Sequence, residues 1–306
     1  MKLRTPILAS AAFGLYLVTS AQAVDTRALT STNTIVSFDT ATPGTITNTV
    51  TLSGLTAGDA VVGIDFRPLD GVLIGLGYNS GTGTVRVYSI TAAGVASSIN
   101  GNTLTIGIGL ARVTADFNPT ANAIRVVTSG ATGNNLRIPT GGTGVLTTDT
   151  DLNPANTGIR ATAYSRNNAG GGTSGATTLY EIDGTNNALV TQGSIDFFTG
   201  SGTSPNTGTL TSVAALTGVV GSTIVGFDIF NAAGTAAASA GTAFVATSTT
   251  LSSLNLATGA AASLGTIGSG LTIVDIATVV PEPASLTLCG LAVVAFAGFG
   301  RKRRKA

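Results

Sequence analysis

The sequence predicts an all-β protein: a β-propeller of five blades, closed where N-terminal strands pair with the last strand, and followed by a C-terminal membrane helix. Three observations predict this fold. The body is rich in glycine and in small and β-branched residues, five similar segments recur along it, and its two incomplete ends complement each other. Short strands with tight turns are typical of such a composition, and a β-type repeat of about 50 residues is typical of propellers.

The N-terminal residues 1–23 have the three parts of a secretory signal in order. Two basic residues precede an apolar segment, 7–18, and the small residues Ala21 and Ala23 form an A-x-A cleavage site. We therefore expect an exported protein whose mature chain begins at Val24.

Five segments of the body, 24–280, share a short β-prone pattern, and four of them carry an aspartate in the same register. The aligned positions are Asp65, Asp116, Ala163, Asp228 and Asp275, at spacings of 51, 47, 65 and 47 residues. The first four segments are each followed by further β-prone runs bounded by Gly, Asn, Asp or Ser, as in antiparallel hairpins. Each repeat therefore predicts one four-stranded blade with the aspartate register on its first strand.

The two ends of the body predict how the ring closes. The fifth repeat has only its first strand, 271–277, whereas the N-terminal region supplies three strands, 27–29, 34–38 and 45–52, with no Asp-bearing strand before them. Joined together they make one complete blade, and this closure removes an exposed sheet edge. A β-helix or a pair of β-sandwiches is the alternative, but neither explains why the ends complement each other.

The C-terminal segment, 281–306, has three elements in a fixed order. The motif Pro281-Glu282-Pro283 is followed by an apolar run, 284–300, and by a basic end. A helix of this apolar length spans about 25 Å, near the lower limit for a bilayer, and the basic end favours the cytoplasmic side. The pattern alone predicts a transmembrane helix.

This order of motif, apolar helix and basic end resembles the PEP-CTERM sorting signal. The resemblance implies that an exosortase-type enzyme removes the tail near the motif. It also implies a Gram-negative host that makes extracellular polysaccharide, with transient inner-membrane anchoring before transfer to the cell surface or matrix. A plain membrane anchor is the alternative.

Several motifs follow one another along residues 27–278. They include Thr34-Ile35-Val36-Ser37-Phe38-Asp39, Gly63-Ile64-Asp65-Phe66-Arg67-Pro68, Ala115-Asp116-Phe117-Asn118-Pro119, Thr178-Leu179-Tyr180-Glu181-Ile182-Asp183 and Gly226-Phe227-Asp228-Ile229. Their order is similar to that of a bacterial family, the domain of unknown function 4394. Since that family has no established activity, the resemblance supports the fold and implies no reaction.

The composition excludes several kinds of chemistry. The chain has no histidine, and its body has no lysine, which excludes Ser-His-Asp catalysis, His-ligated metals and Schiff-base chemistry. The body has 8 arginines and 13 acidic residues, a net charge of −5, so we expect no nucleic-acid partner. The single cysteine, Cys289, lies in the apolar tail, so no disulfide can form within the chain.

The recurrent aspartates are the candidate site: Asp65, Asp116, Asp228 and Asp275. The interpretation that we favour is structural, with each carboxylate accepting hydrogen bonds from backbone N–H groups or from an arginine (Arg67, Arg112 or Arg125). The alternative is a ring of carboxylates that holds a hard cation such as Ca²⁺. Two turns, Asp70-Gly71 and 183–187, could likewise be calcium loops, but hairpin turns are the interpretation that we favour.

The favoured function is therefore a non-enzymatic surface or matrix propeller, with no catalytic residue and no cofactor other than the calcium alternative. Its expected partners are the exosortase-type enzyme and an exopolysaccharide or surface protein. The alternative is a carboxylate-based enzyme acting on extracellular polysaccharide. Such an enzyme needs converging carboxylates in a deep pocket at one mouth of the ring.

Overall fold

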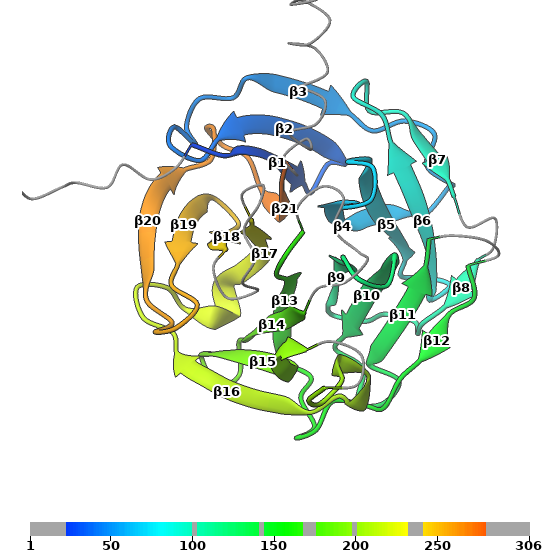
Figure 1. The fold of residues 1–306 in the computed structure, drawn as a ribbon. Helices are drawn as coiled ribbons and strands as arrows, with labels where there is room; N and C mark the ends of the chain where they lie inside the picture. Colours follow the sequence, from blue (N-terminus) through cyan, green and yellow to red (C-terminus); the bar gives the residue numbers. More distant parts are fainter. Residues whose placement is uncertain are drawn as a thin grey trace, which may run out of the picture.

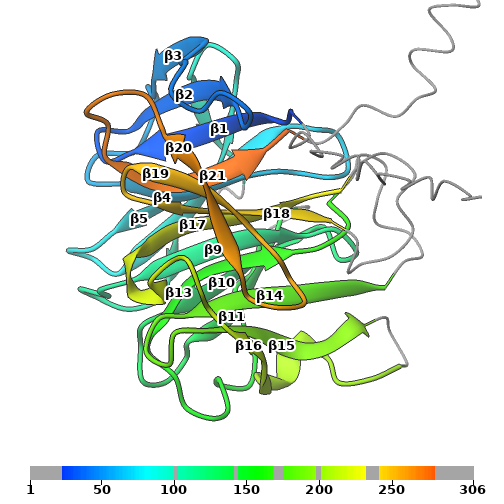
Figure 2. The same ribbon diagram turned by 90° about the vertical axis from the view of Figure 1, so that its left-hand side faces the viewer.

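The computed structural model describes residues 23–99, 103–140, 144–167, 176–197, 201–231 and 241–279. These residues form five antiparallel sheets arranged as blades around a central axis (Figure 1). Figure 2 shows the inner strands running through the thickness of the ring. The predicted five-bladed propeller is confirmed.

Each blade begins at the axis with one strand and adds antiparallel neighbours outward. Blade 1 contains β21 (Ile273–Thr278), β1 (Asp25–Thr30), β2 (Thr34–Asp39) and β3 (Asn48–Thr51). Blade 2 contains β4 (Ala60–Phe66), β5 (Leu73–Asn79), β6 (Thr84–Ile90) and β7 (Ala96–Ser98), with β8 (Leu104–Thr105) also paired to β6. Blade 3 contains β9 (Val113–Asn118), β10 (Ala123–Thr128), β11 (Asn135–Pro139) and β12 (Thr147–Thr148).

The last two blades carry one short 3₁₀ helix each. Blade 4 contains β13 (Ile159–Tyr164), β14 (Thr177–Asp183), β15 (Ala188–Phe197) and β16 (Leu210–Ala215), with η1 (Pro205–Thr207) before its outer strand. Blade 5 contains β17 (Ile224–Phe230), β18 (Thr242–Thr247), β19 (Thr250–Leu254) and β20 (Ala261–Thr266), and η2 (Gly221–Thr223) leads into β17.

The ring closes within blade 1, where the ends of the body meet. β21 pairs antiparallel with β1, with Arg27 opposite Ala277 and Leu29 opposite Asp275. β2 lies on the other side of β1, so residues 34–38 share a sheet with 273–277. The predicted closure is confirmed, and the pairing with β21 covers the edge of β1 that would otherwise be exposed.

The hydrophobic core lies between the blades because side chains alternate between the two faces of each strand. Five buried clusters occupy the five junctions between neighbouring blades. At the junction of blades 2 and 3, for example, Val85 and Val87 of β6 pack with Ile124 and Val126 of β10. Each fully buried side chain of this size contributes about 1.5–3 kcal/mol, so packing between blades is the main stabilising term.

Glycine permits close contact at the outer rim, where blade 4 meets blade 5. Thr217 and Ala260 form a parallel β-bridge there. The next residue, Gly218, has φ of 78°, and a Cβ at that position would lie 2.2 Å from the carbonyl oxygen of Ala261. Only glycine fits this conformation and this approach without strain, which explains part of the high glycine content.

Some strand boundaries differ from those predicted. The strand predicted over 45–52 begins at Asn48, because Pro43-Gly44 starts a turn in which the Thr45 amide bonds Thr42. Two further strands of the outer rim, β12 and β8, are only two residues long. Residues 1–22 of the predicted signal peptide (1–23) and the whole predicted tail (281–306) lie outside the described residues. Within the described ranges, no helix has the length and apolar character needed to cross a membrane.

Candidate functional site on the propeller axis

The aspartate register lies on the five inner strands that surround the axis. Neighbouring inner strands contact each other in the order β4, β9, β13, β17, β21 and back to β4. The register positions are Asp65 on β4, Asp116 on β9, Ala163 on β13, Asp228 on β17 and Asp275 on β21. The pattern thus brings four carboxylates to the innermost layer.

Each of these aspartates accepts a hydrogen bond from a backbone N–H of the next inner strand around the ring. The four pairs, from donor nitrogen to carboxylate Oδ2, are Ile64 to Asp275 (2.8 Å), Phe117 to Asp65 (2.8 Å), Tyr164 to Asp116, and Thr278 to Asp228 (2.5 Å). We call these four hydrogen bonds the axial cross-links. Because each joins two blades through a backbone group, they connect the inner strands independently of the hydrophobic clusters.

The step from β13 to β17 has no axial cross-link, because blade 4 carries Ala163 at the register position. Amide groups connect these two strands instead. Asn167 donates from Nδ2 to Asp228 Oδ1 (3.2 Å), and the Arg166 amide donates to Asn231 Oδ1 (2.7 Å). The ring of polar connections is therefore complete although the aspartate register is not.

Arg112 adds a second connection at the other end of the inner strands. Its Nε donates to the carbonyl of Arg160 on β13 (2.8 Å), and its Nη2 donates to the carbonyl of Ile224 on β17 (2.7 Å). Burial, together with repulsion from Arg160, lowers the pKa of Arg112 to about 10. The arginine thus links three blades through carbonyl groups.

The three arginines proposed as hydrogen-bond partners of the axial aspartates have other partners. Arg67 pairs with Asp70 (2.5 Å), and Arg125 pairs with Asp149 (2.7 Å). Arg112 bonds carbonyl groups, as described above, and only its electrostatic attraction acts on Asp275. Among the described residues the axial aspartates thus rely on N–H and O–H donors outside the arginines, which corrects this part of the prediction.

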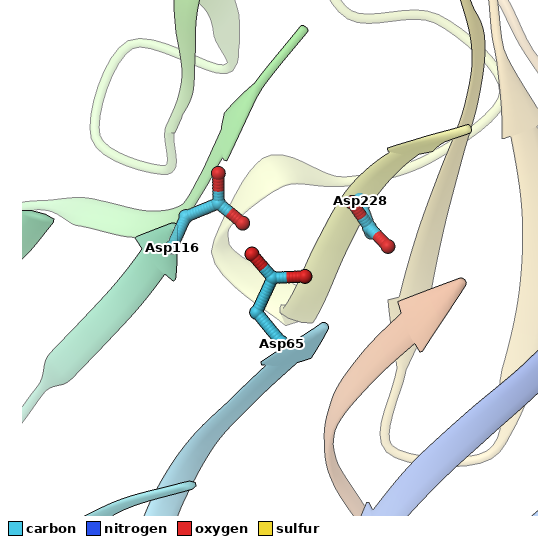
Figure 3. A group of neighbouring side chains, drawn as sticks. All are labelled: Asp65, Asp116 and Asp228. Atoms are coloured by element: carbon cyan, nitrogen blue, oxygen red, sulfur yellow. The ribbon is translucent and has the colours of Figure 1, made fainter. Parts of the chain in front are cut away.

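Three of the four aspartates converge on one point. Each of Asp65, Asp116 and Asp228 offers a carboxylate oxygen, and these oxygens lie within 4.8 Å of one another. Figure 3 shows the Asp65 carboxylate lying between those of Asp116 and Asp228. We call these three residues the carboxylate cluster. Their exposed fractions are 6%, 4% and 1%, so the cluster is buried. Asp275, the fourth predicted residue, lies outside it.

Burial dominates the electrostatics of the cluster. Desolvation raises the pKa of Asp65 and of Asp116 well above the ordinary range, and repulsion from the neighbouring carboxylates raises them further. Desolvation also raises the pKa of Asp228, but the hydrogen bonds from Thr278 oppose it and limit the value to about 6. Burial likewise raises the pKa of Asp275. Three buried carboxylates that lie this close together need protons or a cation to offset their negative charge.

The space beside the cluster is small. A cavity of ≈ 10 Å³ lies against Asp65 and Asp116 and is otherwise lined by apolar residues such as Ile74, Leu76 and Ile124. A volume of this size admits about one water molecule. The cluster can therefore hold a proton, a water or a single ion, but it offers no room for a sugar.

A second buried polar region, at the junction of blades 3 and 4, was not predicted as a site. Arg125 is 1% exposed there, and besides Asp149 it bonds Asn135 (2.6 Å) and Asn206 (2.7 Å). Glu181 is fully buried and neither of its carboxylate oxygens has a hydrogen-bond partner. Desolvation raises its pKa to about 8. The sequence signal was available, since Glu181 is the only glutamate in the body and follows apolar residues in a strand.

The two turns considered as calcium loops are occupied by protein donors. The Asp183 carboxylate accepts from the amides of Thr185 (2.9 Å) and Asn186 (3.0 Å) and from the side chain of Asn156 (2.8 Å). Asp70 bonds Arg67 and the Val72 amide. Both segments are turns between strands, as favoured by the sequence.

A groove on blade 4 lies beside the second of these turns and is lined in part by Asp183, Thr185 and Asn186. This groove has a volume of ≈ 360 Å³. Its lining includes residues with amide or hydroxyl groups and apolar residues, among them Asn156, Thr185, Asn186, Ser212, Ala188 and Val190. We call it the blade 4 groove. Its volume falls within the usual range of about 300–1,000 Å³ for ligand sites.

Solved structures with a similar arrangement have low identity to this chain. A protein from Lactobacillus plantarum is 16% identical with a TM-score of 0.40, covering 81% of this chain and 68% of its own. A functionally unknown protein from Desulfotomaculum acetoxidans is 16% identical with a TM-score of 0.42, covering 85% and 90%. Myxococcus xanthus glutaminyl cyclase is 14% identical with a TM-score of 0.38, covering 76% and 74%. No curated protein matches the chain.

A family model matches residues 34–277, from β2 of blade 1 to the closing strand β21. The match covers all four aspartates of the register and most of the chain. The chain therefore belongs to the family described as Domain of unknown function (DUF4394).

Proposed function

We propose that this chain is an exported, non-enzymatic propeller that serves as a binding or structural component of the cell surface or of an exopolysaccharide matrix. One observation carries the proposal. The carboxylates that converge are each bonded to the backbone of a neighbouring blade, are buried, and lie beside a cavity of only ≈ 10 Å³. Glycoside hydrolysis needs two carboxylates that flank the scissile bond of a bound sugar. The cluster has carboxylates but lacks the space for that bond.

The composition supports the same conclusion. Without histidine in the chain or lysine in its body, carboxylates are the principal acid–base groups available to an enzyme. The only glutamate of the body, Glu181, is buried away from the axis at the junction of blades 3 and 4. A carboxylate-based enzyme acting on extracellular polysaccharide is therefore the weaker alternative.

The export part of the proposal rests on the two terminal segments of the sequence, 1–23 and 281–306. An exosortase-type enzyme is the processing partner that the C-terminal motif suggests. Intact-mass measurement of the protein from its native host tests both cuts. We expect a chain that begins at Val24 and ends near Pro281–Pro283, whereas a species that retains Cys289 would indicate a plain membrane anchor.

We assign binding to the blade 4 groove, because it has the volume of a ligand site and the hydroxyl and amide groups that can hydrogen-bond a glycan. The body, 24–280, is suitable for the test because it contains every described strand and the pairing that closes the ring. Ser212 is exposed on β16 and lines the groove, whereas Ser263 is exposed at the corresponding outer strand β20 of blade 5.

The experiment compares Ser212→Arg with its matched control Ser263→Arg on a glycan array and in an assay of sugar release. We expect the wild type and Ser263→Arg to bind extracellular polysaccharide without releasing product, and Ser212→Arg to lose binding. Release of sugars that Asp65→Asn abolishes would overturn the non-enzymatic proposal. Binding that both arginine variants retain would overturn the assignment to the groove.

A further inference from the structure

The carboxylate cluster contains one buried oxygen that has no hydrogen-bond partner among the protein atoms. Asp65 uses Oδ2 to accept the axial cross-link from Phe117 (2.8 Å), while its Oδ1 is buried and has no hydrogen-bond partner among the protein atoms. Figure 3 shows this carboxylate directed between Asp116 and Asp228. A buried carboxylate oxygen without a partner is unfavourable, so Oδ1 requires either a proton shared with Asp116, whose side chain lies within hydrogen-bonding reach, or a bound ligand.

No positive side chain of the described residues offsets the charge at this point. The five salt bridges among the described residues involve Asp25, Asp59, Asp70 and Asp149, and none involves a member of the cluster. Arg112 acts on Asp275, which lies outside the cluster. Three carboxylates therefore meet in a buried place without a protein counter-charge.

We propose that Asp65, Asp116 and Asp228 together bind one hard divalent cation on the propeller axis, of the class of Ca²⁺. Calcium–oxygen distances are about 2.3–2.6 Å, so two oxygens on opposite sides of one Ca²⁺ lie about 4.6–5.2 Å apart. The oxygens of the cluster lie within 4.8 Å of one another. A single ion between them can therefore contact all three carboxylates.

The donors suit calcium better than magnesium or a transition metal. The side chains that converge are all carboxylates, and oxygen atoms are the ligands that calcium prefers. The chain has no histidine, the imidazole ligand that zinc, copper and nickel often use. A carboxylate has about four lone-pair sites, so an oxygen that accepts a backbone N–H can also coordinate an ion. Magnesium usually keeps several waters, whereas the cavity beside Asp65 has ≈ 10 Å³, enough for about one.

The axial cross-links and the cation are compatible roles for the same residues. Each cross-link is accepted by the Oδ2 atom, and a carboxylate oxygen that accepts one hydrogen bond keeps a lone pair that can coordinate an ion. An ion held by β4, β9 and β17 would thus connect three inner strands at once. Calcium should therefore stabilise the closed ring, because it binds the folded state and has no site in the unfolded chain.

Asp275 provides a matched control for the test. It accepts the same kind of backbone hydrogen bond as Asp116, from Ile64 (2.8 Å), and is also buried, but it does not belong to the cluster. Replacement of either residue by asparagine keeps an oxygen for the cross-link and removes one negative charge. The two variants therefore differ mainly in whether the carboxylate cluster is complete.

The experiment uses the wild type, Asp116→Asn and Asp275→Asn, each stripped of metal with EDTA and then freed of EDTA. Thermal unfolding is measured with and without Ca²⁺, and Ca²⁺ binding is measured by calorimetry. At a free Ca²⁺ concentration of 100 times Kd, we expect the Tm of the wild type to rise by about 5–10 °C, with one ion bound per chain. Asp275→Asn should show the same rise and Asp116→Asn should show none. Absence of binding to the wild type at millimolar Ca²⁺, or an equal rise in all three proteins, would overturn the proposal.

A structural measurement covers the case in which Asp116→Asn does not fold. Crystals of the wild-type body grown in CaCl₂ should show anomalous difference density between the three carboxylates. If the three carboxylates are well defined in the electron density but no anomalous difference density lies between them, the proposal is contradicted, whatever the behaviour of the variant.

Discussion

Replacement of Glu181 by glutamine should make the protein more stable at alkaline pH and leave it almost unchanged at acidic pH. Glu181 lies on β14, is fully buried, and has no hydrogen-bond partner for either carboxylate oxygen. Of the charged groups that act on it, Arg125 favours its ionised form and Asp183 opposes it, but desolvation is larger than both. The buried side chain is thus held as the neutral acid, and glutamine is a neutral side chain of nearly the same shape.

The magnitude follows from the raised pKa. The value changes from an ordinary 4.5 to about 8 in the folded protein, and each pKa unit corresponds to about 1.4 kcal/mol. Ionising Glu181 in the folded protein thus costs on the order of 5 kcal/mol. Since the folded state binds the proton more tightly, this contribution to stability is fully present below pH 4.5. It is lost progressively as the pH rises through about 8.

Urea unfolding of the wild type and of Glu181→Gln, measured at intervals from pH 5 to pH 9, tests this reasoning. The wild type also contains the carboxylate cluster, whose raised pKa values give a slope of the same sign, so the difference between the two proteins isolates Glu181. Asp70→Asn is the control, because the Arg67 hydrogen bond lowers the pKa of this surface carboxyl and its contribution changes only at lower pH. Parallel curves for the wild type and Glu181→Gln from pH 5 to pH 9 would refute the reasoning.

Three further predictions concern the frame of the ring. Asp116→Ala should lower the free energy of unfolding in EDTA by about 1–3 kcal/mol, because it leaves a buried backbone N–H without an acceptor; Asp116→Asn should lose less, and an equal loss would contradict the cross-link. Gly218→Ala should be more destabilising than Gly71→Ala in urea unfolding. Both positions have positive φ, which costs an alanine about 1–2 kcal/mol, but only at Gly218 would the added Cβ also clash with a carbonyl oxygen. Arg125→Met should cost about 1–3 kcal/mol, because Asn206 Oδ1 loses its donor while Asp149 keeps its ion pair with Arg137. Arg67→Met at the surface should cost about 0–1 kcal/mol, and a larger loss for Arg67→Met than for Arg125→Met would contradict the different burial of the two arginines.

The arrangement of the blades could be predicted because its signals are local and repeat. The aspartate register at 65, 116, 228 and 275 marks one inner strand for each repeat, and the incomplete repeats at the two ends indicate the closing pair. Strand content followed from alternating apolar residues and from glycine and asparagine at the turns. These properties depend on neighbouring residues in the chain, so one sequence was enough.

The convergence of three aspartates could not be predicted, because it depends on the stagger between blades. Asp275 bonds the amide of Ile64, one residue before the aligned Asp65, whereas Asp228 bonds Thr278, three residues after the aligned Asp275. The inner strands are thus shifted along the axis relative to one another. Alignment of the repeats gives no information on this shift, which is set by the packing between blades, so all four aspartates looked equivalent.

The partners of the arginines could not be predicted for a related reason. Arg125 lies on the same strand pair as Asp116, and the two are opposite in register. Their side chains nevertheless have different partners, and Arg125 bonds Asp149 and Asn206, which are 24 and 81 residues distant in the chain. Such contacts are made between a strand and the loops of the next blade, and the sequence pattern does not indicate the paths of those loops.

Amide hydrogen exchange, followed residue by residue by NMR, tests most directly whether the axial aspartates join each blade to the next. Two variants of the body, 24–280, Asp65→Ala and Asp116→Ala, are compared with the wild type in EDTA. The cross-links predict that exchange at Phe117 accelerates most in Asp65→Ala, and that exchange at Tyr164 accelerates most in Asp116→Ala. If both amides kept the protection that they have in the wild type, or lost it equally in the two variants, the central claim would be contradicted.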